Sequence, residues 1–149
     1  MPDTPRPEPF ISKPPERVLF LCIHNSARSQ IAEGFAHDMA PADTQIWSAG
    51  TESTRVHPMA IKVMKEAGID ITKQSSKTLD EVPWKDADTV VTLCGEADEA
   101  CPTLASTVRR VHWPLPDPSS ASKAEQEQAF HQAVDEIRWR VSSLWPRGD

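Results

Sequence analysis

The order of short apolar runs and helical patterns is the feature that most limits the fold of this chain. Residues 17–22 read Arg-Val-Leu-Phe-Leu-Cys, and a continuous apolar run of this length is typical of a strand buried in a parallel sheet. Further strands are expected at residues 44–48, 88–94 and 108–113.

Helical patterns separate and follow these strands. One covers residues 28–41, a second covers residues 58–68, and the last follows Ser122 and Glu125, a pair typical of a capping box. The order β-α-β-α-β-β-α predicts an α/β fold, with a four-stranded parallel sheet and helices on both faces. Ligands of such sheets bind at the carboxyl ends of the strands, where two of the cysteines are expected.

The N-terminal end differs in composition from the rest of the chain. Residues 1–16 hold six of the 14 prolines, which exclude helices and sheet ladders and predict an extended or disordered tail. Residues 17–149 are expected to form one domain, as is usual for a chain of 149 residues.

Charge, hydropathy and cysteine content limit the partners. The net charge is −6 without a basic cluster, which argues against nucleic acid and anionic membranes. The longest apolar run, residues 18–23, is much shorter than the roughly 20 residues that span a bilayer, and too short for a signal peptide. We expect a soluble, cytoplasmic monomer.

Three cysteines are too few for a disulfide scaffold, which leaves catalytic, redox, metal-binding or buried roles open.

A candidate oxyanion site follows the first strand. Residues 22–29 read Cys-Ile-His-Asn-Ser-Ala-Arg-Ser, a Cys-x5-Arg-Ser pattern between a strand and a helix. A tight loop that enters a helix N-terminus presents several backbone N–H groups to one point, and such a nest binds a tetrahedral oxyanion. Arg28 can add a bidentate contact, and Asn25 is expected at the positive φ that the loop needs. The expected binding residues are Ile23, His24, Asn25, Ser26, Ala27, Arg28 and Ser29.

Cys22 is the candidate nucleophile of this site. The positive environment of the nest favours its thiolate form, and the Ser29 hydroxyl is placed to donate to the sulfur. The alternative is a cysteine that is merely buried at a strand end, with Arg28 as a surface charge.

Two further cysteines and one carboxylate extend the candidate site. Cys94 and Cys101 have a spacing that differs from that of a zinc knuckle, but a disulfide between them is feasible if the intervening segment unwinds. Beside a cysteine loop that binds an oxyanion, a thiol relay is a better interpretation than two unrelated cysteines. Asp117 stands between Pro116 and Pro118, which fix its backbone, so that its carboxyl can protonate a leaving oxygen. An ordinary Asp-Pro turn is the alternative.

Three segments together resemble the thioredoxin-coupled arsenate reductases, which share the fold of the low-molecular-weight tyrosine phosphatases. They are C-I-H-N-S-A-R-S-Q-I-A-E at residues 22–33, V-T-L-C-G-E-A-D-E-A-C-P at residues 91–102 and H-W-P-L-P-D-P at residues 112–118. The resemblance extends from Arg17 to about Trp145, and the set of three cysteines makes it specific.

The resemblance implies a reaction and a role for each residue. Cys22 attacks the arsenic of arsenate, which the loop amides and Arg28 hold, while Asp117 protonates the departing oxygen. Cys94 then attacks Cys22 and releases arsenite, and Cys101 attacks Cys94 to form a disulfide that thioredoxin reduces. The implied function is arsenic detoxification, with thioredoxin as external reductant, phosphate and sulfate as substrate analogues, and no bound cofactor or metal.

Two positions depart from the family pattern. Ala27 stands where some relatives have a further cysteine, which the relay does not need. Some relatives bind a potassium ion beside the loop, and Asn25, Glu33 and Ser48 match that site. Lys77 stands where those relatives carry an acidic residue, so its ammonium is expected to replace the ion.

Two other functions compete with this interpretation. A low-molecular-weight protein tyrosine phosphatase would use the same loop and acid, but it usually has aromatic residues after the acid, where this chain has Ser119 and Ser120. Weak phosphatase activity is expected nonetheless, because phosphate and arsenate share shape and charge. A non-enzymatic thiol sensor of metalloids explains neither Arg28 nor Asp117, and the chain lacks the basic helix of a DNA-binding sensor.

Overall fold

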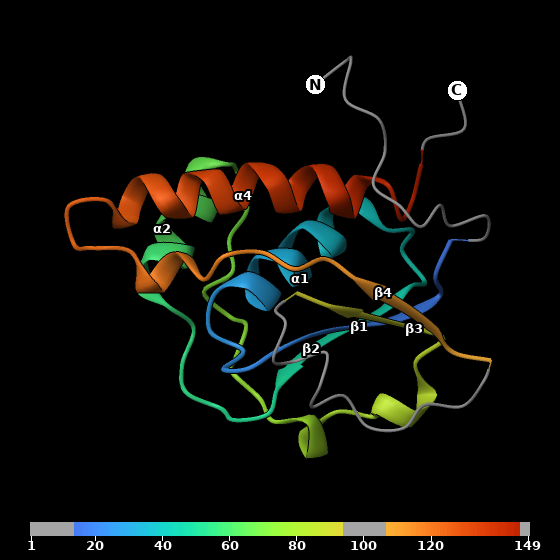
Figure 1. Cartoon of the computed structure of the whole chain (residues 1–149). Coiled ribbons are helices and arrows are strands. Elements are labelled where there is room, and N and C mark those ends of the chain that lie inside the picture. Colours follow the sequence, from blue (N-terminus) through green and yellow to red (C-terminus); the bar gives the residue numbers. More distant parts are fainter. Residues whose placement is uncertain (1–13, 94–106, 147–149) are drawn as a thin grey trace.

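Four parallel strands form the centre of the fold (Figure 1). The structure is a computed structural model that describes residues 14–93 and 107–146. The strands are β1 (Arg17–Cys22), β2 (Gln45–Gly50), β3 (Thr89–Thr92) and β4 (Arg109–His112), and their order in the sheet is β2-β1-β3-β4. β1 lies inside the sheet and is buried from its second residue onward, as its continuous apolar run predicts.

The register of the sheet brings the carboxyl ends of the strands to one edge. Cys22 at the end of β1 pairs with Gly50 at the end of β2, and Leu21 pairs with Thr92 at the end of β3. Beyond β4, the Leu115 N–H donates to the Leu93 carbonyl at 3.0 Å, so the chain continues along this edge. The loop after β1 therefore meets the turn after β4.

The described α-helices lie together on one side of the sheet (Figure 1). They are α1 (Arg28–Met39), α2 (Pro58–Glu66) and α4 (Gln126–Ser142). α1 packs on β1 and β2, and α4 packs on both α1 and α2. Among the described residues, the other side carries two short 3₁₀ helices, η1 (Leu79–Glu81) and η2 (Trp84–Asp86). The predicted α/β class with a four-stranded parallel sheet is confirmed. Helices are predicted on both faces, and among the described residues those of the second face are short 3₁₀ helices.

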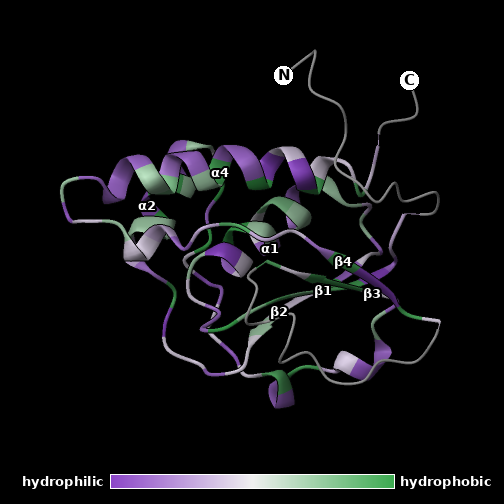
Figure 2. Ribbon diagram, in the orientation of Figure 1, coloured by the Kyte–Doolittle hydropathy of each residue, from purple (hydrophilic) through white to green (hydrophobic). Residues whose placement is uncertain are grey.

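Apolar side chains fill the space between the sheet and the helices. Figure 2 shows hydrophobic residues along the inner strands β1 and β3, whereas much of the visible surface of α4 is hydrophilic. This is the expected pattern for a helix that packs one stripe of side chains on a core. Large side chains that are fully buried in the protein include Phe20, Ile31, Phe35, Trp113, Phe130 and Ile137.

The capping box predicted at Ser122 and Glu125 is wrong. A turn at residues 123–125 delays the helix, so α4 begins at Gln126, and its N-cap residue Glu125 makes no side-chain capping bond. The Ser122 hydroxyl donates instead to Glu125 Oε1 at 3.1 Å. Thr78 and Glu81 form a capping box instead, at the N-terminus of η1.

The two ends of the described chain are joined by a hydrogen bond. Trp145 Nε1 donates to the Pro15 carbonyl at 3.0 Å, and the Trp145 side chain is buried. Residues 1–13 of the proline-rich segment lie outside the described residues, so the tail stays a prediction. Within residues 14–93 and 107–146, no helix has the length and apolar character that crossing a membrane requires.

Candidate active site

The loop between β1 and α1 has the backbone conformation that the sequence predicts. Asn25 has a φ of 50°, and it is the only described residue other than glycine with a positive φ. α1 begins after Ala27, which offers no side-chain cap to the first turn. A helix N-terminus without a side-chain cap leaves N–H groups that an anion can bind. The loop is thus suited to a tetrahedral oxyanion.

The Asn25 side chain holds this loop in shape from behind. It is fully buried, and its Nδ2 donates to Ser29 Oγ at 2.8 Å and to Ser48 Oγ at 2.9 Å. Its Oδ1 accepts from the Lys77 backbone N–H at 2.8 Å and from Gln30 Nε2 at 2.9 Å. All the polar atoms of the amide are therefore satisfied. The predicted bracing role of Asn25 is confirmed.

Gly50 allows β2 to approach the loop closely. A Cβ atom at this position would lie 2.4 Å from the Ile23 carbonyl oxygen and 2.8 Å from the Asn25 backbone nitrogen. Both neighbours are backbone atoms of the loop, which cannot move aside cheaply. The sequence analysis assigns Gly50 no role, because the register that places it beside Cys22 is a long-range property.

Cys22 lines a small cavity together with several polar residues. Cys22 is 2% exposed. Its Sγ lies 3.1 Å from Ser29 Oγ, which is the contact predicted from the sequence. Because Ser29 Oγ accepts from Asn25, the Ser29 proton is free to be donated to the sulfur. The cavity has a volume of about 20 Å³ and is lined by Cys22, His24, Ser26, Ala27, Arg28, Asp117 and Ser119.

Arg28 and Asp117 form an ion pair in the lining of this cavity, and this pair is termed the mouth of the oxyanion loop. Arg28 Nη1 donates to the Leu115 carbonyl at 2.9 Å, and its Nη2 lies 3.7 Å from Asp117 Oδ2. Burial raises the pKa of Asp117, but hydrogen bonds from Ser119 and the charges of Arg28 and His24 outweigh this effect and leave the pKa below its ordinary value. Asp117 is therefore ionised at neutral pH when no anion is bound.

The other predicted binding residues fall into two groups. His24, Ser26 and Ala27 line the cavity, whereas Ile23 does not. The Ile23 carbonyl accepts from the Glu52 N–H at 3.0 Å, and the binding role of Ile23 stays a prediction. Cys94 and Cys101 lie outside the described residues, and their predicted redox roles stay predictions.

His57 supports the loop from the side of α2, and the sequence analysis assigns it no role. Its backbone N–H donates to the Ser26 carbonyl at 2.9 Å, and its Nδ1 accepts from the Met59 N–H at 3.0 Å as the N-cap of α2. Its ring packs on Phe130, with ring centroids 4.9 Å apart. Burial lowers the pKa of His57, although the negative charge of Asp117 partly opposes this. The neutral ring is the form that can accept the capping bond.

The residues that match the potassium site of some relatives do not fit that ion in this chain. Glu33 Oε1 accepts from the Ser48 hydroxyl at 2.5 Å, and the Lys77 ammonium lies 3.9 Å from the same oxygen. The ammonium also donates to the Ser75 carbonyl at 2.6 Å. The Lys77 ammonium therefore lies where a bound cation would pair with Glu33.

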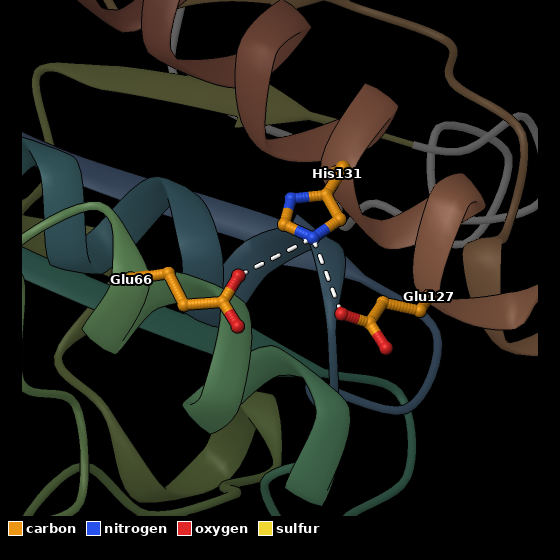
Figure 3. Close-up of side chains that lie close together, drawn as sticks. All are labelled: Glu66, Glu127 and His131. Carbon is orange, nitrogen blue, oxygen red and sulfur yellow. Dashed lines mark ion pairs between the residues drawn. The ribbon is translucent and has the colours of Figure 1, made fainter.

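A separate cluster of titratable side chains joins α2 to α4 (Figure 3). His131 Nε2 lies 3.3 Å from Glu66 Oε1 and 3.5 Å from Glu127 Oε2. Glu127 Oε1 also accepts from the Lys62 ammonium at 3.0 Å, and this bond lowers the pKa of Glu127. These side chains are 46–53% exposed, so the cluster is an ion-pair network on the surface, and none of them lines the cavity of Cys22.

The fold and the site define a family. Residues 17–147 match the family of low molecular weight phosphotyrosine protein phosphatases, and the chain belongs to it. Within this family the chain is similar to arsenate reductases. That of Bacillus subtilis (strain 168) is 44% identical over 133 residues, which cover 88% of this chain and 96% of the relative.

Solved structures agree with these matches. An arsenate reductase in the phosphate binding state has a TM-score of 0.72 at 35% identity, over 87% of this chain and 95% of that chain. A thioredoxin-dependent arsenate reductase from Corynebacterium glutamicum has a TM-score of 0.72 at 26% identity, over 91% of this chain and 62% of that chain. The family resemblance predicted from the sequence is confirmed.

Proposed function

We propose that this protein reduces arsenate to arsenite through three cysteines, with thioredoxin as reductant, and so detoxifies arsenic. The observation that carries the proposal is the position of the Cys22 sulfur, which faces a donor hydroxyl and lines a polar cavity with Arg28 and Asp117. The names of the similar proteins support arsenate as the substrate and thioredoxin as the reductant. A thiol relay needs a reducing compartment, so the proposed location is the cytoplasm.

The size of the cavity supports a small inorganic substrate. Its volume of about 20 Å³ is little more than the roughly 10–15 Å³ that one water molecule requires. An oxyanion can place an oxygen there and present its central atom to the sulfur. The organic part of a phosphate ester is too large for this cavity, and the lining offers it Ser119 instead of an aromatic side chain. Weak phosphatase activity on small esters is consistent with this geometry.

The first chemical step joins sulfur to arsenic. The Cys22 thiolate attacks arsenic, an As–S bond forms, and one oxygen leaves as water. Arg28 and the loop amides offset the negative charge that develops on the remaining oxygens. The departing oxygen needs a proton, whereas Asp117 is ionised in the free protein. A bound anion raises the pKa of a neighbouring carboxyl. Arsenate that binds with two protons supplies both protons of the departing water: one is already on the departing oxygen, and Asp117 can take up the other and pass it on.

The next steps transfer electrons through the thiols. The Cys94 thiolate attacks the sulfur of Cys22, and an S–S bond forms while the As–S bond breaks. The electron pair of the As–S bond stays on arsenic, which leaves as arsenite. Cys101 then attacks Cys94, which frees Cys22, and the dithiol of thioredoxin reduces the Cys94–Cys101 disulfide.

Three serine variants test this order of events, with NADPH, thioredoxin and thioredoxin reductase supplying electrons. We expect Cys22→Ser to show no turnover with arsenate. We expect Cys94→Ser to bind phosphate normally, because its thiol acts after anion binding, but to release no arsenite. Cys101→Ser should release one equivalent of arsenite and then stop, with a Cys22–Cys94 disulfide detectable by mass spectrometry.

The variant at Cys101 decides between the relay and its alternatives. Many turnovers of Cys101→Ser with thioredoxin would contradict the order of thiols proposed above. Absence of NADPH consumption by the wild-type protein, together with tight binding of arsenite, would favour a metalloid sensor. Turnover of aryl phosphates far faster than that of arsenate would favour a phosphatase.

A further inference from the structure

We infer that Lys77 is a positioning residue, whose ammonium fixes the hydrogen bonds that shape the oxyanion loop. The inference rests on the proposed function only in taking this loop as the anion site. Five contacts connect the ammonium to the nucleophile in one continuous polar chain. The polar chain consists of Lys77, Glu33, Ser48, Asn25, Ser29 and Cys22.

The donor and acceptor roles along the polar chain all follow from the carboxylate. An ionised carboxylate can only accept, so the Ser48 hydroxyl must direct its proton to Glu33 Oε1. Ser48 Oγ is then left to accept from Asn25 Nδ2. The second N–H of the same amide goes to Ser29 Oγ, which leaves the Ser29 proton for the sulfur of Cys22. The charge at Glu33 therefore sets the direction of every bond up to the nucleophile.

The buried carboxylate needs a positive charge nearby, and Lys77 supplies it. The Glu33 side chain is only 10% exposed, and an unpaired charge in such a position is costly. Lys77 Nζ lies 3.9 Å from Glu33 Oε1, the oxygen that Ser48 contacts. His37 contacts the other oxygen, Oε2, at 3.1 Å, but its side chain is 53% exposed. Without the ammonium, solvent would draw the carboxylate away from Ser48.

Two hydrogen bonds hold the backbone of Lys77 in place, and neither of them involves its side chain. Its N–H donates to Asn25 Oδ1 at 2.8 Å, and its carbonyl accepts from the Gly50 N–H at 2.8 Å. A substitution that removes only the charge leaves both bonds intact. A change in phosphate affinity after such a substitution is therefore due to loss of the ammonium and not to loss of the backbone bonds to Asn25 and Gly50.

An open cavity gives small ions access to this charge pair. It has a volume of about 570 Å³, and Glu33, Lys73 and Lys77 are among its lining residues. Lys73 carries the same charge in the same cavity but is exposed, whereas the described ion pairs of Glu33 are with Lys77 and His37. Lys73 is therefore a matched control for the charge of Lys77.

The test measures phosphate binding by calorimetry, with thermal unfolding to show that each variant is folded. For Lys77→Met we expect phosphate affinity to fall about tenfold, a difference of about 1.4 kcal/mol. Lys77→Arg should keep most of the affinity, and Lys73→Met should match the wild type. Ammonium chloride should restore part of the affinity of Lys77→Met, whereas tetramethylammonium chloride at equal ionic strength should not, because that ion is too large to pair with Glu33.

Three results would overturn the inference. They are wild-type affinity in Lys77→Met, an equal loss in Lys73→Met, or equal rescue by both ammonium ions. If Lys77→Met does not fold, Ser48→Ala breaks the same polar chain while keeping every charge, and unchanged phosphate affinity in that variant also contradicts the inference. Phosphate binding needs neither Cys94 nor arsenate, so a protein that binds phosphate normally but does not reduce arsenate would contradict the proposed function alone.

Discussion

The underside and the mouth of the oxyanion loop are built in different ways. On the underside, Asn25, Ser48 and Glu33 are buried and joined by hydrogen bonds of 2.5–2.9 Å. At the mouth, Arg28 Nη2 and Asp117 Oδ2 are 3.7 Å apart, and the Asp117 side chain is 34% exposed. The underside is thus saturated with partners of its own, whereas the mouth keeps charges that are only loosely paired.

This difference indicates which part of the site is fixed before an anion binds. A saturated and buried network loses much if one partner is removed, so it holds the loop in one shape. The Arg28 guanidinium keeps its bond to the Leu115 carbonyl and is only loosely paired with Asp117, so its Nη2 group can bind an anion without breaking a close ion pair. Asp117 can change its protonation state. Preorganisation of the loop and adaptability of the mouth are therefore assigned to different residues.

The largest expected effect comes from crowding the underside with Gly50→Ala. The added Cβ would meet the Ile23 carbonyl oxygen at 2.4 Å, so the loop must shift away from its anion-binding shape. We expect the free energy of unfolding to fall by about 3 kcal/mol and phosphate binding to be lost. Urea unfolding and calorimetry measure the two effects.

Gly68→Ala is the control for this substitution. Gly68 has a φ of 88°, and a Cβ there would meet no atom within 4 Å. We expect a loss of stability of about 1 kcal/mol from backbone strain, with phosphate binding unchanged. Equal phosphate affinity in Gly50→Ala and Gly68→Ala would contradict the conclusion that the underside is fixed before an anion binds.

A smaller effect is expected at the mouth, where Arg28→Lys keeps the charge but removes the planar pair of donors. Lysine cannot bind an anion in a bidentate manner, so we expect phosphate affinity to fall about thirtyfold, or about 2 kcal/mol. The stability should change by about 1 kcal/mol at most, through loss of the bond to the Leu115 carbonyl. A loss of stability larger than the loss of binding energy would show that the mouth is structural.

The smallest expected effect is a pH dependence at His57, which supports the loop from outside both regions. Its folded pKa is lowered by burial, so the unfolded chain takes up a proton more readily. The stability due to the neutral ring should be complete above about pH 6.5 and decline as the pH falls, with a slope below about 1.4 kcal/mol per pH unit. Urea unfolding between pH 8 and pH 5 measures this slope.

His57→Asn is the matched control for the pH series. Asparagine can still accept the capping bond from the Met59 N–H, but it does not titrate. The variant should show a flatter dependence of stability on pH than the wild type. Identical slopes for the two proteins would exclude His57 as the source.

Local patterns in the sequence predict the elements whose cause is local. The apolar run of β1 and the positive φ of Asn25 follow from residue types alone, and both are confirmed. The contact of Ser29 with Cys22 follows from the spacing of one loop and the first helical turn. These features need no knowledge of which distant strand lies beside them.

The residues that the sequence analysis misses depend on contacts between distant segments. Gly50 matters because the register of β2 places it against Ile23, and His57 matters because its N–H reaches Ser26. The start of α4 is mispredicted because a turn competes with a motif that looks complete in the sequence. Only the family resemblance points to Lys77, since nothing local relates it to Glu33.

The hydrogen bond from Trp145 to the Pro15 carbonyl has a practical consequence. Pro15 precedes the start of β1, whereas Cys22 stands at the opposite end of that strand. The polypeptide therefore enters and leaves the fold at the corner remote from the sulfur. Reporter domains or surface tethers attached directly at residues 14 and 146 would start far from the entrance to the reacting thiol, and a short peptide joining Pro15 to Trp145 would permit circular permutation.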